Sequence, residues 1–419
     1  MQKIIDKEIS HKGPHIGRFN ILRSTAALRG VVIIVFACIG CLMLVISHAA
    51  QPAISAEAEK GKLTGTSIIS DSKASGGHAV KFGNSKPASG STGSTTPVSL
   101  GRFGMALGGS YQTFSTAELN KNFADMEAMG VQWVRFDIAW NDIQSGGSSS
   151  YNWGPYDNVV NAARQHNLKI LGILDFAPTW AQQPSCAGQF ACPPNGTSSF
   201  ATYVTAAVNH YKPLGVSYWE IWNEPNITNF WLTPSPSAYT ALLKAAYTAI
   251  KKVDSSATVI SAGLAPAATD GTNYEQYDFI KGMYAAGAHG SFDALGDHPY
   301  CYSDQAGCLG TPDGNEWWQM AQTSQNIRQL MVANGDSSKK IWMTEFGAPT
   351  NVYTEAQQAQ MMQQAYTLAA SYSWAGPLFW YTYQDGGTDK TNVEDWFGVL
   401  RADGSQKPAY TTYKQLTGK

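Results

Sequence analysis

The stretch Val216-Ser-Tyr-Trp-Glu-Ile-Trp-Asn-Glu-Pro-Asn226 begins like a strand and ends like a turn. Its first half is rich in β-branched and aromatic residues, which suit the pleated surface of a buried strand. Pro225 offers no backbone N–H to a strand ladder, so the strand should stop before it and present Glu224 at its carboxyl end. Taken alone, the turn could also be a strand cap in which Glu224 is solvated and Asn223 shapes the turn.

A second stretch, Lys339-Lys-Ile-Trp-Met-Thr-Glu-Phe-Gly347, also has the pattern of a strand that ends in an acid, here Glu345. If both strands belong to one barrel, the two glutamates meet at the same face, which two unrelated caps would not explain. Paired carboxylates suit cleavage of a glycosidic bond, because one protonates the leaving oxygen while the other attacks the anomeric carbon. An apolar flank keeps the acid protonated near neutral pH, and the amide of Asn223 can bind a sugar hydroxyl.

From Gly101 onward, strand-like and helix-like segments alternate, which argues for a parallel sheet. Two helix starts carry a capping-box pattern, Ser115-Thr-Ala-Glu118 and Thr354-Glu-Ala-Gln357. The expected strands are residues 102–107, 131–140, 168–176, 216–222, 258–264, 294–300, 341–344 and 377–383. Eight such units predict an α/β fold, a (β/α)8 TIM barrel, over residues 99–419. An open doubly wound sheet is the alternative, but the glycines within residues 101–109 lack the spacing of a nucleotide-binding turn.

These motifs resemble those of the clan A glycoside hydrolases, most of all family 39 and its relatives in family 5. The resemblance rests on Trp219-Glu-Ile-Trp-Asn-Glu-Pro-Asn226, followed by Phe230-Trp231, and on Trp342-Met-Thr-Glu-Phe-Gly347. It extends from about Leu100 to the C-terminus. It implies a retaining mechanism with Glu224 as acid/base and Glu345 as nucleophile, without a metal or an organic cofactor.

The resemblance also implies which residues bind substrate: Arg135, Asn223, His298, Tyr300 and Trp380. Arg135 is expected on the floor of the site near Glu345, although an ion pair with Asp137 that serves only the fold is the alternative. The Tyr300 hydroxyl is expected to bond Glu345, and His298 to lie near the sugar or to be structural. Trp380 is expected to offer its ring as a sugar platform. Loop residues Trp140, Trp180 and Trp231 are candidates for further subsites or for plain loop packing.

The first hundred residues have a different composition. A basic N-terminus precedes an uncharged apolar run over residues 30–47, followed by Ser47-His-Ala49 as a plausible cleavage site. We interpret residues 1–50 as an export segment, either a cleaved signal peptide or a retained membrane anchor, which places the rest of the chain outside the membrane. Residues 51–98 are rich in Gly, Ser and Thr and are expected to form a flexible linker without structure.

Charge and cysteine content fit an exported enzyme. The net charge of −2 gives no reason to expect a nucleic acid as partner. Disulfides Cys186–Cys192 and Cys301–Cys308 are the simplest pairing, although the other two pairings of these cysteines and a four-Cys zinc site are the alternatives.

The sequence therefore predicts an exported, monomeric, retaining β-glycoside hydrolase that cleaves a polysaccharide or oligosaccharide, acting within the chain (endo). An exo-acting β-xylosidase or β-glucosidase and an envelope transglycosylase would share every motif. A non-catalytic carbohydrate-binding protein could dispense with either glutamate, and both are present.

Overall fold

The computed structural model describes residues 66–70, 78–82, 101–301, 309 and 316–419. The chain divides into two units, Met1–Thr92 and Gly93–Lys419. Within the part of the chain that the structure describes, no helix combines the length and apolar character needed to cross a bilayer. The apolar run over residues 30–47 lies outside the described residues.

The first unit contains a small antiparallel hairpin inside the segment that was expected to have no structure. Strand β1 (Thr66–Ser70) pairs with β2 (His78–Phe82), with Ile68 opposite Val80. The expectation of an unstructured linker is wrong for these residues. Both runs contain β-branched residues, which favour strands, and the surrounding Gly- and Ser-rich composition obscured that signal.

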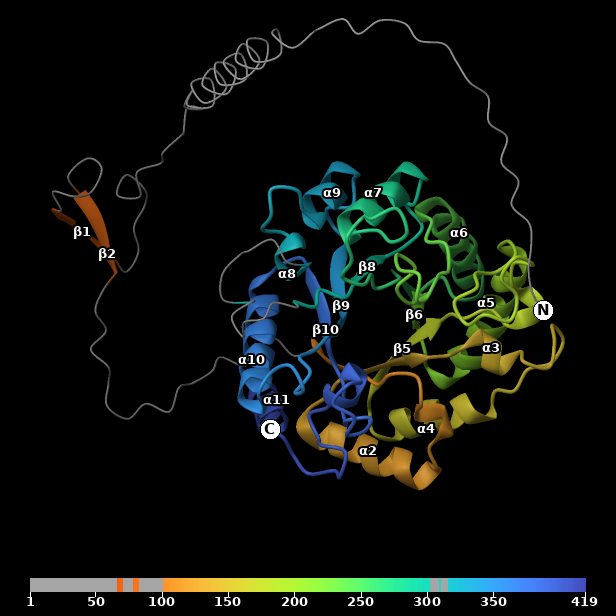
Figure 1. The fold of residues 1–419 in the computed structure, drawn as a ribbon, viewed down its shortest axis with the longest axis horizontal. Coiled ribbons are helices and arrows are strands. Elements are labelled where there is room, and N and C mark those ends of the chain that lie inside the picture. The colour runs from red at the N-terminus through yellow and green to blue at the C-terminus, as the bar shows by residue number, and fades with distance from the viewer. Residues whose placement is uncertain (1–65, 71–77, 83–100, 302–308, 310–315) are drawn as a thin grey trace, which may run out of the picture. The chain divides into compact units, whose positions relative to one another are not determined.

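The second unit is built on a closed barrel of parallel strands, so the predicted (β/α)8 fold is confirmed (Figure 1). Around the barrel the order is β10-β3-β4-β5-β6-β7-β8-β9. The strands are β3 (Phe103–Ala106), β4 (Trp133–Asp137), β5 (Lys169–Leu174), β6 (Tyr218–Ile221), β7 (Thr258–Ser261), β8 (Ala294–Asp297), β9 (Lys340–Phe346) and β10 (Ala375–Tyr381). Each lies where the sequence pattern placed a strand.

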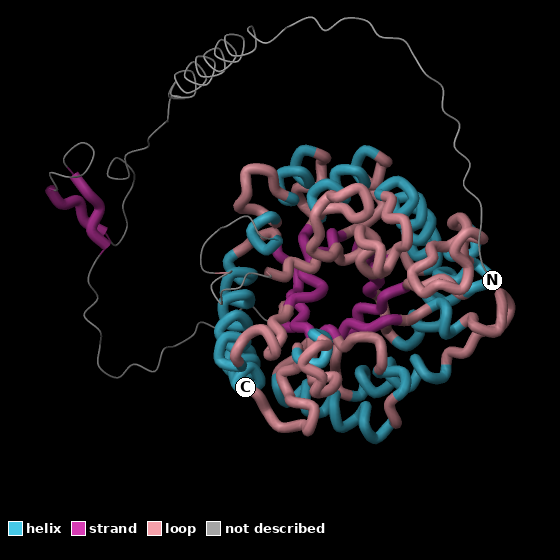
Figure 2. The backbone as a smooth tube through the Cα atoms, viewed as in Figure 1, coloured by secondary structure: helices cyan, strands magenta, loops and turns pink. Residues whose placement is uncertain are grey.

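Helices surround the strands, as Figure 2 shows in cyan around the magenta ring. They are α2 (Thr116–Met129), α3 (Trp140–Ile143), α4 (Gly154–Gln165), α5 (Ser198–Tyr211), α6 (Pro236–Val253), α7 (Gln276–Ala285), α8 (Glu316–Gln319), α9 (Ile327–Ala333), α10 (Glu355–Ser371) and α11 (Pro408–Thr417). Both predicted capping boxes are present, at Ser115 and Glu118 for α2 and at Thr354 and Gln357 for α10.

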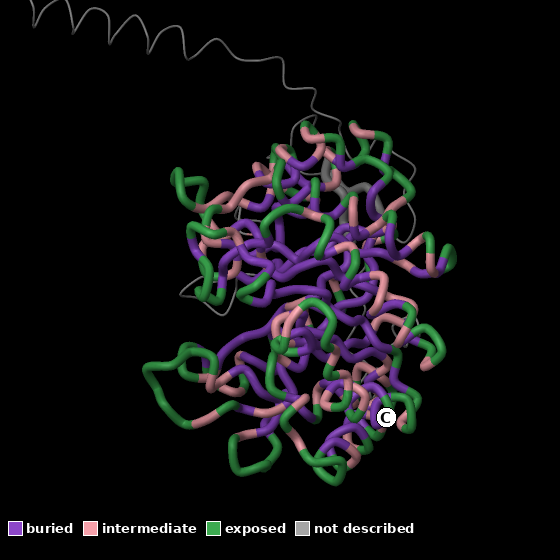
Figure 3. Tube along the Cα trace, turned by 90° about the vertical axis from the view of Figure 1, so that its right-hand side faces the viewer, coloured by how far each residue is buried: buried purple, intermediate pink, exposed green. Residues whose placement is uncertain are grey.

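Large aromatic side chains fill the interior of the barrel toward the amino-terminal ends of its strands. The rings of Trp133, Tyr218, Trp342 and Phe379 make edge-on, tilted and stacked contacts with one another, with centroids 4.6–6.5 Å apart. All the core residues of this cluster come from strands and none from a helix, so it lies inside the ring, apart from the larger core between strands and helices. Figure 3 shows buried strands through the middle of the unit and exposed loops at its rim. The aromatic layer leaves only the carboxyl-terminal end of the barrel open for a site.

Candidate active site

A cavity of about 590 Å³ opens at the carboxyl ends of the strands. Side chains from several strand ends and the loops that follow them line it, including Arg135, Asp137, Asn223, Glu224, Tyr300, Glu345, Tyr381 and Glu394. The two glutamates predicted from strand ends therefore reach the same cavity. This is the end of a (β/α)8 barrel at which functional sites form.

A turn with unusual backbone geometry carries Glu224 into the cavity. Strand β6 ends at Ile221, and Trp222 and Glu224 then adopt positive φ angles of 72° and 45°. For non-glycine residues this conformation costs roughly 1–3 kcal/mol, so contacts with the surrounding structure must stabilise it. The Trp222 N–H donates to Leu174 O (3.0 Å) and the Glu224 N–H donates to Gly263 O (3.0 Å), which fixes the turn to the strands on either side.

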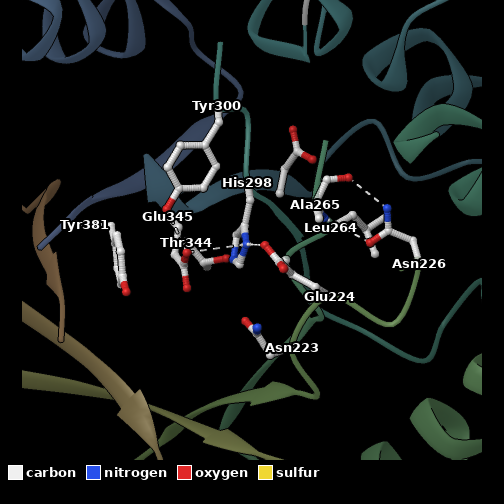
Figure 4. Close-up of polar contacts among 12 residues, drawn as sticks. Asn223, Glu224, Asn226, Leu264, Ala265, His298, Tyr300, Thr344, Glu345 and Tyr381 are labelled. Atoms are coloured by element: carbon white, nitrogen blue, oxygen red, sulfur yellow. Dashed lines mark hydrogen bonds and ion pairs between the residues drawn. The ribbon is translucent and has the colours of Figure 1, made fainter. Parts of the chain in front are cut away.

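Asn226 anchors the same turn from its far end. Its Nδ2 donates to the backbone oxygens of Ala265 (2.8 Å) and Tyr274 (2.9 Å), while its Oδ1 accepts from the Ala265 N–H (2.9 Å) (Figure 4). The side chain is fully buried. The motif Asn-Glu-Pro-Asn thus ends in a residue that holds the Glu224 turn on the loop after β7.

An irregularity in β9 directs Glu345 into the barrel. Met343 pairs with Leu378, and Phe346 pairs with Trp380. Between these two pairs, β9 therefore contains one more residue than β10. Such a bulge breaks the alternation of side chains, and here both Thr344 and Glu345 make contacts on the interior side. The Glu345 carboxylate accepts from Arg135 Nη1 (2.5 Å) and from the Tyr300 hydroxyl (2.8 Å).

The two glutamates lie close enough for a shared reaction. One carboxylate oxygen of Glu224, one of Glu345 and a ring nitrogen of His298 all lie within 4.8 Å of one another. Retaining glycosidases keep their carboxyl groups about 5–5.5 Å apart, whereas inverting enzymes need roughly 6.5–9.5 Å for an intervening water. The observed separation fits the retaining geometry.

Beneath the cavity, Arg135 and Glu220 form a buried ion pair with side-chain exposures of 3% and 0%. Arg135 Nε donates to Glu220 Oε2 (2.6 Å), and Glu220 Oε1 also accepts from the Gly263 N–H (2.8 Å) and the Thr344 hydroxyl (3.0 Å). The pairing of Arg135 is therefore with Glu220 and Glu345. Asp137 contributes charge nearby but forms no ion pair with Arg135 within 4.0 Å.

Close approach at Gly263 permits this packing. A Cβ at this position would lie 2.1 Å from His298 Nε2 and 2.5 Å from the Thr344 hydroxyl. No side-chain contact of that length is tolerated, so any larger residue would displace the imidazole or the threonine.

The hydrogen bonds of Arg135 also determine the tautomer of His298. A guanidinium can only donate, so His298 Nε2, which lies 3.3 Å from Arg135 Nη2, must accept. The proton is then on Nδ1, which donates to Glu224 Oε1 (2.8 Å). Burial lowers the pKa of His298, which keeps the ring neutral. Arg135 Nη2 also donates to Asn223 Oδ1 (2.8 Å), so the Asn223 amide nitrogen remains to serve a ligand.

Burial raises the pKa of both cavity glutamates. For Glu224, desolvation raises the pKa, the His298 hydrogen bond opposes the rise, and the charge of Glu345 adds to it. For Glu345, desolvation again raises the pKa, while Arg135 and the Tyr300 hydroxyl lower it. Glu345 is thus hydrogen-bonded to a cation and a hydroxyl that favour its anion, whereas Glu224 is hydrogen-bonded to a neutral imidazole and is influenced less by the charge of Arg135. This asymmetry suits an acid and a carboxylate in one site.

Glu224, His298 and Glu345 are also the one group of possible metal ligands found among the described residues. The Nδ1 atom of His298 carries a proton in the tautomer that Arg135 imposes, so it cannot donate a lone pair to a metal. The cluster is better explained as a hydrogen-bonded acid–base site.

The expectation that Trp380 forms a sugar platform is wrong. Its side chain is fully buried and packs edge-on against Phe346, with ring centroids 5.9 Å apart. Successive side chains of a strand point to opposite faces, so Phe379 and Tyr381 face the barrel interior and Trp380 faces the helices. Tyr381, one residue later, lines the cavity instead (Figure 4).

Two of the three loop tryptophans are packing residues. Trp140 is fully buried, and Trp231 is 3% exposed and lies edge-on against Trp222 beneath the Glu224 turn. Neither lines the cavity. Trp180 is 40% exposed and lines an adjoining hollow.

The predicted disulfide Cys186–Cys192 is present, with an S–S distance of 2.01 Å. Cys308 lies outside the described residues, and the second predicted bond with it.

Comparison with known proteins assigns the family. Residues 91–384 match the family described as Cellulase (glycosyl hydrolase family 5). The chain belongs to glycosyl hydrolase family 5. This is a family of O-glycosyl hydrolases, and the resemblance to the clan A glycoside hydrolases is confirmed.

Solved structures share the fold of this family 5 chain at low identity. A family 39 glycoside hydrolase from Bacteroides cellulosilyticus has a TM-score of 0.60 and 24% identity, covering 75% of this chain and 64% of that one. A monomeric β-xylosidase from Caulobacter crescentus has a TM-score of 0.57 and 19% identity, over 75% and 67% of the two chains. GH5_18 from Bifidobacterium longum has a TM-score of 0.56 and 14% identity, over 76% and 79%. The chain thus spans less than two thirds of the length of the family 39 enzyme.

Sequence reasoning missed Glu220, although a signal for it was present. Arg135 and Glu220 are opposite charges, each in the middle of an apolar strand, and a buried charge needs a partner. Only Glu345 and Asp137 are expected from the sequence as neighbours of Arg135, and Glu220 is not among them.

Replacing Glu220 tests the buried ion pair. Glu220→Gln leaves the Arg135 charge without its main partner, so the free energy of unfolding should fall by about 3–5 kcal/mol. Glu355→Gln is the matched control, because Glu355 pairs with Arg401 at 32% and 41% exposure and should cost only about 0–1 kcal/mol. Denaturant unfolding of both variants measures the difference, and equal small losses would contradict a structural role for the pair.

Proposed function

We propose that this family 5 chain is a retaining β-glycoside hydrolase that acts by double displacement, with Glu345 as nucleophile and Glu224 as acid/base. The observation that carries the proposal is the approach of the two carboxylates to within 4.8 Å in one cavity. The different partners of the two groups support the division of roles. Arg135 and Tyr300 stabilise the Glu345 anion, whereas Glu224 is recessed beside a neutral histidine.

In the first step, Glu345 Oε attacks the anomeric carbon as the glycosidic C–O bond breaks. Glu224 gives its proton to the departing oxygen, so the leaving group is released as an alcohol and the sugar is held as an ester of Glu345. The Asn223 amide nitrogen, whose oxygen is fixed by Arg135, is placed to donate to a sugar hydroxyl.

In the second step, the Glu224 carboxylate removes a proton from water. The water oxygen attacks the anomeric carbon, the ester bond breaks, and Glu345 leaves as a carboxylate. Two displacements at the same carbon restore the β configuration. Transfer to a sugar acceptor instead of water would use the same residues, so a transglycosylase is the alternative for this step.

The charges around the cavity favour an uncharged substrate. Four carboxyl groups line it (Asp137, Glu224, Glu345 and Glu394), and Arg135 is the one lining cation among the described residues. Arg135 is already bonded to Glu220 and Glu345. A polyuronide or sulfated glycan would meet repulsion without a free cation to bind, so a neutral β-glycan is the best candidate.

Endo action is supported by hollows that adjoin the cavity. One shares Phe190 with it, and another shares the residues Gly108, Gly109, Tyr381 and Glu394. A glycan longer than one sugar can therefore extend from the cavity into either hollow. An exo-acting β-xylosidase or β-glucosidase would release single sugars from the chain end, and the product profile from xylan, glucan and mannan distinguishes the two.

Export of the enzyme is a further proposal, supported by the basic and apolar N-terminus and by the Cys186–Cys192 disulfide. N-terminal sequencing of protein from cell fractions should find a start near residue 50 in the medium, or the intact N-terminus in the membrane fraction if the segment is an anchor. Recovery of intact chain in the cytoplasm alone would contradict export.

Azide trapping tests the two catalytic roles. With an activated aryl β-glycoside, Glu224→Ala should form the ester of Glu345 and then stall, and azide should release a β-glycosyl azide without needing a base. Glu345→Ala should be inactive until azide takes the place of the carboxylate and yields an α-glycosyl azide. On polysaccharide, Glu224→Ala should lose about 10²–10⁴-fold in rate.

The matched control for azide trapping is Glu394→Ala, which removes another cavity carboxylate and should give no glycosyl azide. Exchange of the two azide products between the glutamate variants would reverse the roles. Normal hydrolysis by both variants would exclude this mechanism.

The pH dependence should follow the protonation of Glu224. Activity requires this group as an acid, so kcat/KM should fall as the pH rises through its pKa, which burial places above the ordinary value for glutamate. For the aryl substrate, Glu224→Gln should abolish this alkaline limb. Asp137 also lines the cavity, and burial raises its pKa to about 6. Asp137→Asn should keep an alkaline limb, and its loss in that variant would assign the limb to Asp137.

A further inference from the structure

The hollow that adjoins the active-site cavity at Phe190 has the composition of a carbohydrate site. Its volume is about 520 Å³, and its lining includes Asn141, Trp180, Gln189 and Phe190. No charged side chain lines it, in contrast to the acidic cavity beside it. We propose that this hollow is a second subsite that holds a neutral sugar of the same glycan chain, an inference that rests on the proposed function.

Exposed aromatic rings are the first argument. Among the described residues, Trp180 (40% exposed) and Phe190 (56%) are the exposed large aromatic side chains, and both line this hollow. Exposing such rings to water is unfavourable without a ligand. The C–H face of a pyranose packs on an aromatic ring, and a neutral glycan passing from the cavity would meet Phe190 first.

The second argument is that both rings are held in place before any ligand arrives. The Trp180 Nε1–H donates to Gln144 O (2.9 Å), and its ring stands edge-on against buried Trp140, with centroids 5.6 Å apart. The Phe190 ring lies 4.5 Å from that of Phe176, which lines the catalytic cavity. A fixed ring loses little freedom when a sugar binds, so binding keeps more of the contact energy.

The loop that carries Phe190 is itself closed by covalent and polar links. Cys186 and Cys192 are joined by a disulfide on either side of Phe190. Gln182 donates to the backbone oxygens of Ala177 and Gln189 (both 2.9 Å) and accepts from the Gly188 N–H (2.6 Å). These bonds fix the loop to the segment that follows β5, which is the wall shared with the cavity.

An amide group without a partner is the third argument. The Oδ1 atom of Asn141 is buried and has no hydrogen-bond partner among the described residues, while its backbone N–H is held by Phe176 O (2.8 Å). An unpaired buried carbonyl is costly, and Asn141 is itself one of the polar residues that line the hollow. Stacking rings beside an amide are the groups that a neutral sugar requires.

Comparing a long substrate with a short one distinguishes the role of this subsite from that of the catalytic groups. Trp180 lines the hollow and not the catalytic cavity, so Trp180→Ala should lower kcat/KM about tenfold on a β-1,4-linked xylo-, gluco- or manno-hexasaccharide, whichever the wild type cleaves best. With the aryl glycoside of the same sugar, which ends at the catalytic cavity, the change should stay within about twofold. The matched control is Val332→Ala, which trims an exposed apolar residue (51%) on α9 and should change neither substrate.

A second variant tests the subsite without changing the aromatic rings themselves, in case the first substitution disturbs the local structure. Cys186→Ser combined with Cys192→Ser should loosen the loop and reproduce the loss on the hexasaccharide but not on the aryl glycoside. Equal losses on both substrates, or no loss on either, would overturn the subsite.

Failure of the proposed function gives a different result. In that case the wild type cleaves none of the glycosides, and calorimetric titration with the three hexasaccharides replaces the kinetic assay. Weaker binding by Trp180→Ala than by wild type and Val332→Ala would support the subsite, and equal binding or none would overturn it.

Discussion

The ion pair between Arg135 and Glu220 is the constraint on which the site depends. Two opposite charges are removed from water inside the barrel, which is tolerable only when the partners satisfy each other's hydrogen bonds. Glu220 does so with Arg135, Gly263 and Thr344, and Arg135 extends from it to Glu345, Asn223 and His298. One fixed guanidinium therefore orients Glu345, the Asn223 amide and the histidine that contacts Glu224.

Both glutamates reach the cavity through departures from regular strand geometry. A bulge in β9 directs Glu345 inward, and positive φ angles at Trp222 and Glu224 direct the Glu224 side chain from the end of β6 into the same cavity. The strained backbone at Trp222 and Glu224 is held by hydrogen bonds to Leu174 and Gly263, and Asn226 fixes the end of the turn to Ala265. The closed barrel supplies the neighbouring strands to which these bonds are made.

The sequence was sufficient for the strands and for the two acids, because apolar runs and strand-end carboxylates are local signals. It was insufficient where the answer depended on which strands are neighbours. Trp380 is the residue expected from the sequence, whereas Tyr381 lines the cavity, and this difference of one residue moves a side chain from one face of the strand to the other. Likewise Glu220 becomes the partner of Arg135 only when β4, β5 and β6 lie side by side in the barrel.

The coupling between the glutamates can also change the role of Glu224 during the proposed reaction. While Glu345 is charged, its negative field helps to raise the pKa of Glu224, which then keeps the proton that the leaving oxygen needs. Esterification removes that charge, whereas the Nδ1–H of His298 and the charge of Arg135 continue to favour the Glu224 anion. The pKa of Glu224 therefore falls once its proton has been given away. The same residue becomes a base at the moment when water must be activated, without any movement of the backbone.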